Sequence, residues 1–324
     1  MGIKTKFNPL GGAGHSKDSG DLSLWRYSNE VISGKTLLYN YTGTWTNIST
    51  LYVPIVSGKS IINDWTDTTN SGASEVTRNT PFYKNSKATN VDLQHVPFRN
   101  NSMGYAFSDC ENLLSVINLN KNVTNMYATF NYCRNLNVEV TIPSGVTEAP
   151  WVFNYCTNFN SNVIFPSTII NLYATFYACY SLNRNIQIPD SVTSMISTFD
   201  GCNSLNQNIR MPNSLECMYA TFYRCYNFNQ NIEIPNRVTN MSYAFQNCYE
   251  LQGRINVYST EVTDTYRTFW HTNTSKLKEV YIYYQYANGD YTKTYNQAVA
   301  NTSSSYKWNG QNAVIVYNMG RSPW

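Results

Sequence analysis

Apolar side chains recur along the middle of this chain in columns that repeat every 23 residues. In one unit, Met195, Phe199, Cys202 and Leu205 stand three and four residues apart. Such spacing gathers apolar side chains on one face of a helix, so it predicts a helical segment in each unit. A unit this short cannot bury its apolar face alone, whereas a stack of such units can. The pattern therefore predicts a repeat fold.

A second apolar pattern precedes the helical one in each unit. In the segment Ile186-Gln187-Ile188 the apolar and polar residues alternate, which predicts a very short strand with one face inward. Pro189 follows and ends the strand, because proline has no N–H to give to a sheet. We therefore expect each unit to add one short strand to a parallel sheet.

Two columns hold the same residue in all seven units. The cysteines are Cys110, Cys133, Cys156, Cys179, Cys202, Cys225 and Cys248, and the phenylalanines three residues before them are Phe107, Phe130, Phe153, Phe176, Phe199, Phe222 and Phe245. Seven is an odd number for disulfide pairing, and the array lacks the cysteine spacing and the histidines of zinc sites. We interpret both columns as a buried core ladder without a metal site. Cys217 lies outside the column, and we expect it on the rim as a free thiol.

Asparagine recurs four residues after the cysteine column. The positions are Asn137, Asn160, Asn183, Asn206 and Asn229. A side-chain amide can both donate and accept hydrogen bonds, so it can bridge to the backbone of the next unit. We therefore expect an amide ladder that runs along the stack.

The shared columns resemble a known repeat family. The residues that carry the resemblance best lie in 188–210 and are Ile188, Pro189, Ser191, Val192, Thr193, Met195, Phe199, Cys202 and Leu205. They resemble the 23-residue BspA-like leucine-rich repeat, also called the Treponema pallidum type, over roughly residues 100–272, with a degenerate unit at 80–99. The resemblance implies an α/β-type repeat solenoid with a short parallel sheet. It implies little about function, because function resides in sites added to a fold.

The repeats lie between two flanks that are expected to be β-rich. Residues 1–76 open with a glycine-rich arm and continue with strand-like runs at 35–41 and 49–56. Residues 277–324 contain strand-like runs at 277–284 and 313–317, and we expect them to cap the apolar end of the solenoid. The chain therefore divides into an N-terminal anchoring region (1–76), the solenoid with its caps (77–276) and a C-terminal cap (277–324).

A polar strip follows the outward positions of the predicted strands. Its members are Asn162, Asn185, Gln187, Asn208, Arg210, Asn231 and Glu233. Repeat proteins commonly bind partners with such an extended face, so the strip is the candidate binding site. The alternative interpretation is the ordinary solvated face of a parallel sheet.

Tyrosine, with 27 residues, recurs at a double period of 46, as at Tyr127, Tyr173 and Tyr219. This double period indicates either the duplication of a two-unit block or a tyrosine-lined binding surface.

Charge and motifs argue against several classes of protein. Charged residues make up 13% of the chain, the net charge is +3 and no basic run occurs, so we expect no nucleic-acid partner. No apolar run approaches the length that spans a membrane. Phosphate-binding and catalytic motifs are absent, and Glu139 and Glu233 lie four units apart, about 19 Å, too far for a glycosidase pair. We expect neither enzyme activity nor a cofactor.

The beginning of the chain shapes the functional hypothesis, because it lacks the apolar segment of a secretory signal. A BspA-like protein without an export signal fits a bacteriophage particle. We expect a structural and adhesive part of a tail, baseplate or capsid appendage, homo-oligomeric in the particle and anchored to other virion proteins through residues 1–76. The solenoid would bind a host-surface protein or glycan, or only decorate the particle. The alternatives are a bacterial cell-surface adhesin and a non-enzymatic intracellular scaffold.

Overall fold

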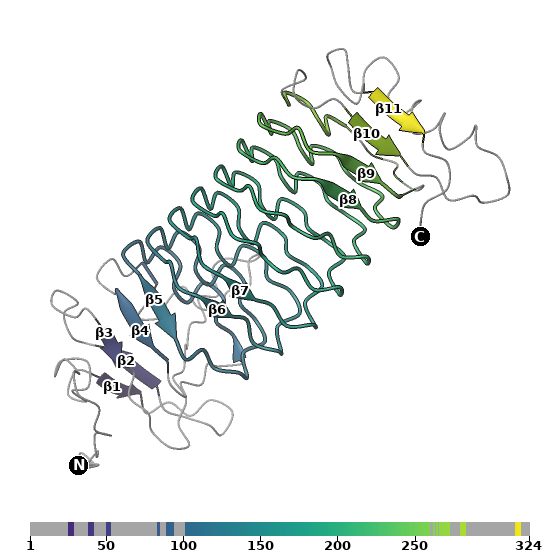
Figure 1. The fold of residues 1–324 in the computed structure, drawn as a ribbon. Helices are drawn as coiled ribbons and strands as arrows, with labels where there is room; N and C mark the ends of the chain where they lie inside the picture. Colours follow the sequence, from purple (N-terminus) through teal and green to yellow (C-terminus); the bar gives the residue numbers. More distant parts are fainter. Residues whose placement is uncertain are drawn as a thin grey trace, which may run out of the picture.

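Successive 23-residue units form coils that stack into an elongated array (Figure 1). The computed structural model describes residues 101–272 apart from 260, 261, 263 and 265, together with 83–84, 89–93 and five short strands nearer the termini. Parallel bridges join one coil to the next at equivalent positions, for example Asn171 to Ser194 and Ser194 to Cys217. The prediction of short parallel strands is confirmed.

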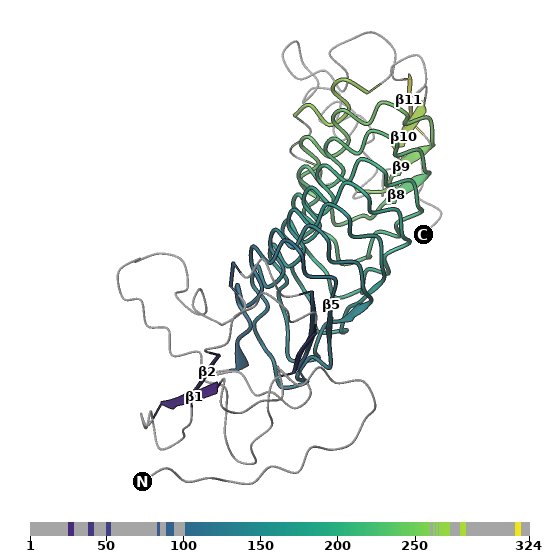
Figure 2. The ribbon, with the colours of Figure 1, turned by 90° about the vertical axis from the view of Figure 1, so that its left-hand side faces the viewer.

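The parallel strands form small sheets along one side of the stack. β3 (Thr50–Tyr52), β4 (Asn90–Asp92) and β5 (Ser115–Ile117) pair in parallel, as do β6 (Val140–Thr141) and β7 (Val163–Ile164). A four-stranded parallel sheet has the order β11 (Ile315–Asn318), β10 (Glu279–Ile282), β9 (Ile255–Val257) and β8 (Ile232–Ile234). These four strands follow one another along one side of the stack in Figure 2. β1 (Trp25–Ser28) and β2 (Leu38–Tyr41) pair antiparallel.

Each of the four strand-like runs expected in the flanks overlaps a strand: β2, β3, β10 and β11. Parallel pairing continues across both predicted boundaries of the repeat region, because β3 pairs with β4 and β9 pairs with β10. The division of the chain into three parts stays a prediction.

Two of the expected strands do not form, at residues 186–188 and 209–211. At the first, the N–H of Ile186 donates within its own coil to the carbonyl of Arg184 (3.0 Å) and not to a neighbouring coil. The alternation of side chains persists there, since Ile186 and Ile188 are buried and Gln187 is exposed. The parallel sheet is therefore interrupted, but the sheet face, formed by the outward side chains of the strand positions, continues.

The predicted helical segment around each cysteine is wrong, because the described residues contain no α-helix. In the coil of Cys202, Ser197 has φ of 51° and Gly201 has φ of 76°. The same two positions are left-handed in the other coils, at Tyr105, Ala128, Trp151, Ala174, Ala220 and Tyr243, and at Asp109, Tyr132, Tyr155, Ala178, Arg224 and Asn247. A right-handed helix cannot continue through such residues. The segment, residues 195–205 in this coil, is a run of tight turns that we call the turn segment.

Hydrogen bonding explains why turns replace the helix. Alternate N–H groups of the turn segment, those of Met195, Ser197, Phe199 and Gly201, donate to carbonyls of the next coil at 2.7–2.9 Å. The N–H groups between them, those of Thr198, Asp200 and Cys202, donate three residues back at 2.9–3.2 Å. A helix uses its N–H groups internally, so it could not tie each coil to the next in this way.

The cysteine and phenylalanine columns lie in the core. All seven cysteines and all seven phenylalanines have 0% exposure. The phenylalanine rings of successive coils stack with centroids 5.4–5.6 Å apart, up to Phe269. Each thiol from Cys133 onward donates to a phenylalanine carbonyl of the preceding coil, as Cys202 Sγ does to Phe176 O (3.1 Å). All eight cysteines are free, and Cys217 is half-buried.

The predicted amide ladder is confirmed. The Oδ1 atom of Asn183 accepts the backbone N–H of Asn206 at 3.0 Å, and Asn183 itself donates its N–H to Oδ1 of Asn160 at 3.0 Å. The series runs from Asn137 to Asn229 without a gap. Each amide therefore satisfies a backbone donor of the following coil.

Thiol titration tests the core ladder. Burial raises the pKa of the column thiols, as at Cys179 and Cys225, so they are neither accessible nor ionised in the folded protein. We expect an aromatic disulfide reagent to react with one thiol in the folded chain, Cys217, and with all eight after unfolding in urea. Cys217→Ser is the control and should remove the reaction of the folded protein. Rapid reaction of several thiols before unfolding would contradict the buried ladder.

Substitution of one ladder asparagine tests the amide ladder. Asn183→Ala removes the acceptor for the N–H of Asn206, and we expect the free energy of unfolding to fall by about 1 kcal/mol. Asn185→Ala, two residues away, removes only an exposed bond with Gln187 and should change stability much less. Urea unfolding monitored by circular dichroism measures both. Equal effects of the two substitutions would argue against a structural role for the ladder.

Candidate functional site

The structure places the predicted polar strip on the sheet face. All seven members, Asn162, Asn185, Gln187, Asn208, Arg210, Asn231 and Glu233, are exposed. The first three line a cavity of about 470 Å³, and the other four line a larger one of about 720 Å³. Each of the two neighbouring cavities is thus lined by residues of successive coils, which lie 23 or 46 positions apart in the sequence.

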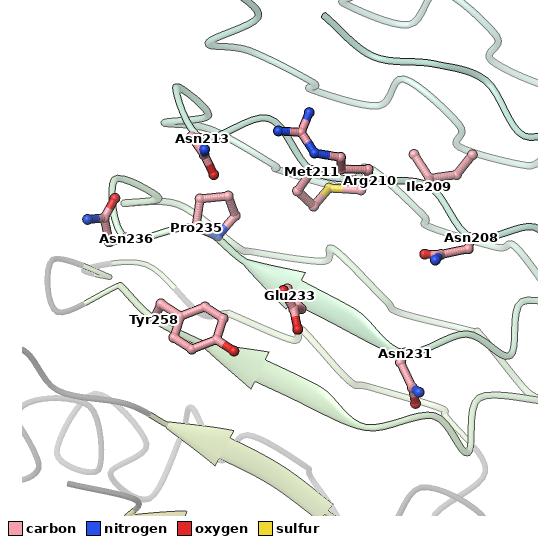
Figure 3. Close-up of a pocket in the computed structure, with 10 residues that line it drawn as sticks. All are labelled: Asn208, Ile209, Arg210, Met211, Asn213, Asn231, Glu233, Pro235, Asn236 and Tyr258. Atoms are coloured by element: carbon pink, nitrogen blue, oxygen red, sulfur yellow. The ribbon is translucent and has the colours of Figure 1, made fainter. Parts of the chain in front are cut away.

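The larger cavity is rich in side-chain amides. Figure 3 shows Asn213 and Asn236 on one side of it, Asn208 and Asn231 on the other, and Glu233 on β8 between them. Amides offer both donors and acceptors, so this cavity can bond peptide groups or hydroxyls. The site also contains Tyr258, Pro235, Ile209 and Met211, which are buried and form its floor and wall.

Of the two charged residues that line this cavity, Arg210 forms an ion pair and Glu233 does not, within the residues that the structure describes. Arg210 Nη1 lies 2.8 Å from Asp190 Oδ1, and this guanidinium lowers the pKa of Asp190. Glu233 forms no ion pair within the described part of the chain, although it lies in the neighbouring coil from Arg210. The cavity therefore presents one carboxylate that can receive a cation.

The sheet face becomes apolar toward the N-terminal coils. Ile117 on β5 and Ile164 on β7 are 47% and 50% exposed, and both line a cavity of about 590 Å³ with Leu119 and Phe165. Lys121 lines the same cavity. The face thus has two halves, which we call the apolar half (Ile117, Leu119, Ile164, Phe165) and the polar half (Asn208, Arg210, Asn231, Glu233).

Several cavity residues were not among the predicted site residues. Ile164 occupies the same outward strand position as Gln187, but a strip defined by polar side chains does not include an isoleucine. Asn213 and Asn236 occupy one column, directly after the repeated proline, and that column was a usable signal. Tyr258 has no such signal, because its place depends on how its coil meets the preceding one.

The turn segments carry rows of aromatic rings. Tyr127 contacts Trp151 with ring centroids 5.2 Å apart, and Trp151 contacts Tyr173 at 5.4 Å. Tyr132 and Tyr155 stack at 4.6 Å with nearly parallel planes. The double-period tyrosines are therefore in contact with the rings of adjacent coils, an arrangement compatible with both interpretations of the period.

One row has a carboxyl group in place of a ring, because Asp200 stands in the column of Tyr177 and Tyr223. Arg224 donates through Nη2 to Asp200 Oδ1 (2.8 Å) and to the hydroxyl of Tyr177 (3.0 Å), and its Nε also donates to Asp200 Oδ1 (3.1 Å). The side chain of Asp200 is only 8% exposed. Burial raises the pKa of Asp200 to about 6, and the nearby Arg224 offsets only part of that rise.

The described residues contain no group of three or more histidine, cysteine, aspartate or glutamate side chains placed to hold a metal ion. In the same part of the chain, no helix has the length and apolar character needed to cross a membrane.

Two sequence families match parts of the chain. Residues 75–197 match the family described as BspA type leucine-rich repeat region, in agreement with the resemblance seen in the repeat columns. Residues 170–282 and 218–322 match the family described as Mycoplasma protein of unknown function, DUF285. The two matches overlap within the repeats, at residues 170–197. No curated protein matches the chain.

Among the similar solved structures, one shows the fold. A leucine-rich repeat protein from Bacteroides ovatus ATCC 8483 is 20% identical, with 80% of this chain and 69% of that chain covered at a TM-score of 0.52, which shows the leucine-rich repeat fold. A leucine-rich cell surface protein from Faecalibacterium prausnitzii A2-165 is 15% identical (90% and 97% covered, TM-score 0.30). A leucine-rich repeat protein from Eubacterium ventriosum ATCC 27560 is 16% identical (77% and 74% covered, TM-score 0.38).

Asp200 gives a testable dependence of stability on pH. Its folded-state pKa lies above the ordinary value of 3.8, so between about pH 4 and 6 the folded protein binds a proton that the unfolded chain does not. We expect this carboxyl to lower the free energy of unfolding by about 2–3 kcal/mol as pH rises through that range. Asp200→Asn should remove this slope in urea unfolding series. Asp190→Asn is the control, because the pKa of Asp190 is lowered and the slope should persist.

Proposed function

We propose that this chain is a non-enzymatic binding protein whose sheet face recognises a protein or glycan on another surface. One observation carries the proposal: all seven residues of the polar strip are exposed and line cavities on a single face of the stack. Cavities lined by convergent polar groups on an extended repeat surface are typical of partner binding.

The variation among coils supports the same proposal. Columns that hold the stack together repeat one residue type, as the cysteine, phenylalanine and asparagine columns do. The outward strand position differs in every coil, from Thr141 through Ile164, Gln187 and Arg210 to Glu233. The stack does not require identity at this position, so each coil is free to present a different group to a partner.

The proposed setting is a bacteriophage particle, with residues 1–76 as the attachment to other virion proteins and with several copies in each particle. The cell surface of a bacterium is the alternative setting. Both predictions rest on the sequence. Mass spectrometry of purified particles and of cell-surface fractions distinguishes them, because the chain should be found in one and not in the other.

Removal of the strip side chains tests the proposed function. We expect the combined substitution Gln187→Ala, Arg210→Ala and Glu233→Ala to weaken binding of the labelled protein to host cells at least about tenfold, because hydrogen-bonding and charged groups would be lost. Flow cytometry over a concentration series measures this. Tyr180→Ser with Tyr249→Ser, which changes two exposed residues of the turn side, is the matched control and should retain binding. Unchanged binding by the folded triple variant would overturn the proposal.

A further inference from the structure

We propose that the partner on the sheet face is an extended protein segment that carries an apolar side chain and, four residues away, a basic side chain. This inference rests on the proposed function and specifies the ligand class of the same face.

The apolar half requires an apolar group. Ile117 and Ile164 are each about half exposed on the sheet side, next to Leu119 and Phe165. The two exposed isoleucines and the two half-buried side chains line one cavity, so together they offer apolar surface that a partner can cover. A leucine-sized side chain can bury its surface there. A sugar would lose water from its hydroxyls against these side chains without gaining hydrogen bonds in return.

The polar half offers a carboxylate and several side-chain amides to a partner. Of the charged residues that line the three cavities, Arg210 is held by Asp190 at 2.8 Å, and Glu139 accepts a hydrogen bond from Asn162 at 3.3 Å. Lys121 belongs to the cavity of the apolar half. Glu233 has neither kind of contact within the described ranges, so it can pair with a lysine or arginine of the partner. The neighbouring side-chain amides can bond the peptide groups of an extended chain.

The distance between the two halves sets the spacing in the partner. Ile164 and Glu233 occupy the same outward column three coils apart, which is about 14 Å at about 4.8 Å per coil. An extended chain advances about 3.4 Å per residue, so four residues span this distance. Side chains four residues apart in an extended chain also point to the same side, so both can face the sheet. A segment with an odd spacing would turn one of the two away.

Fluorescence anisotropy with synthetic peptides tests the inference on the full chain. The probes are labelled peptides with leucine and lysine four residues apart, in both orders, in a serine- and threonine-rich background. We expect one order to bind at least about tenfold more tightly than the same peptide with leucine changed to serine, with lysine changed to glutamate, or with a five-residue spacing.

Substitutions in the protein link each half to its peptide group. Ile164→Thr and Glu233→Gln, both at exposed positions, should each weaken binding about tenfold. Glu233→Lys should abolish binding of the lysine peptide and restore binding of the glutamate peptide. If neither order binds at millimolar concentration, or if Glu233→Lys leaves the preference between the two peptides unchanged, the inference is wrong.

Other occupants give different results. If the chain binds an oligosaccharide on a glycan array and the triple variant at positions 187, 210 and 233 abolishes this binding, the proposed function stands and the protein-segment inference falls. If sedimentation shows a dimer that Ile164→Thr dissociates, the face binds a second copy and the inference is likewise overturned. If the triple variant retains binding to host cells, the proposed function itself fails.

Discussion

The structure depends on how each turn segment divides its backbone N–H groups between bonds within its own coil and bonds to the next coil. In each turn segment, alternate groups bond within the coil and to the next coil, and this alternation requires two left-handed residues per repeat. Left-handed backbone costs about 1–2 kcal/mol for a residue with a side chain, and only Gly201 avoids that cost at these positions. The bonds and contacts between coils must offset it. The fold is therefore stable as a stack and not as a single unit.

Side chains extend this coupling between coils. Cys202 donates its thiol to a carbonyl of the preceding coil, Thr198 donates its hydroxyl to Leu172 O (2.9 Å), and the asparagine column accepts N–H groups of the following coil. These are short side chains that reach backbone atoms, and the bonds satisfy the thiol and the hydroxyl, which are buried. The most constant columns of the sequence are thus occupied in holding neighbouring coils together. The outward side chains of the sheet face are not needed for these bonds, so they can vary from coil to coil.

The sequence predicts the features that recur at a fixed interval: the period, the alternation of buried and exposed side chains at the strand positions, the buried columns and the amide ladder. It does not predict the turn segment, because a helix and a run of tight turns place apolar residues at the same three- and four-residue spacings. The difference lies in backbone angles at residues such as Ser197 and Ala220, which carry no signal of their own. The polar strip followed from strand alternation. The cavities, the exposed Ile117 and the contribution of Tyr258 did not, because they arise where residues 23 or more positions apart meet.

The direction of the bonds between coils has a mechanical consequence. They run along the axis of the stack, so tension between its two ends pulls on them directly. Several bonds join each pair of coils and share the load until one coil detaches. A detached coil releases 23 residues, roughly 80 Å of extended chain, while the coils behind it keep their own neighbours. Under force the chain would lengthen in steps, one repeat at a time, as an extensible tether.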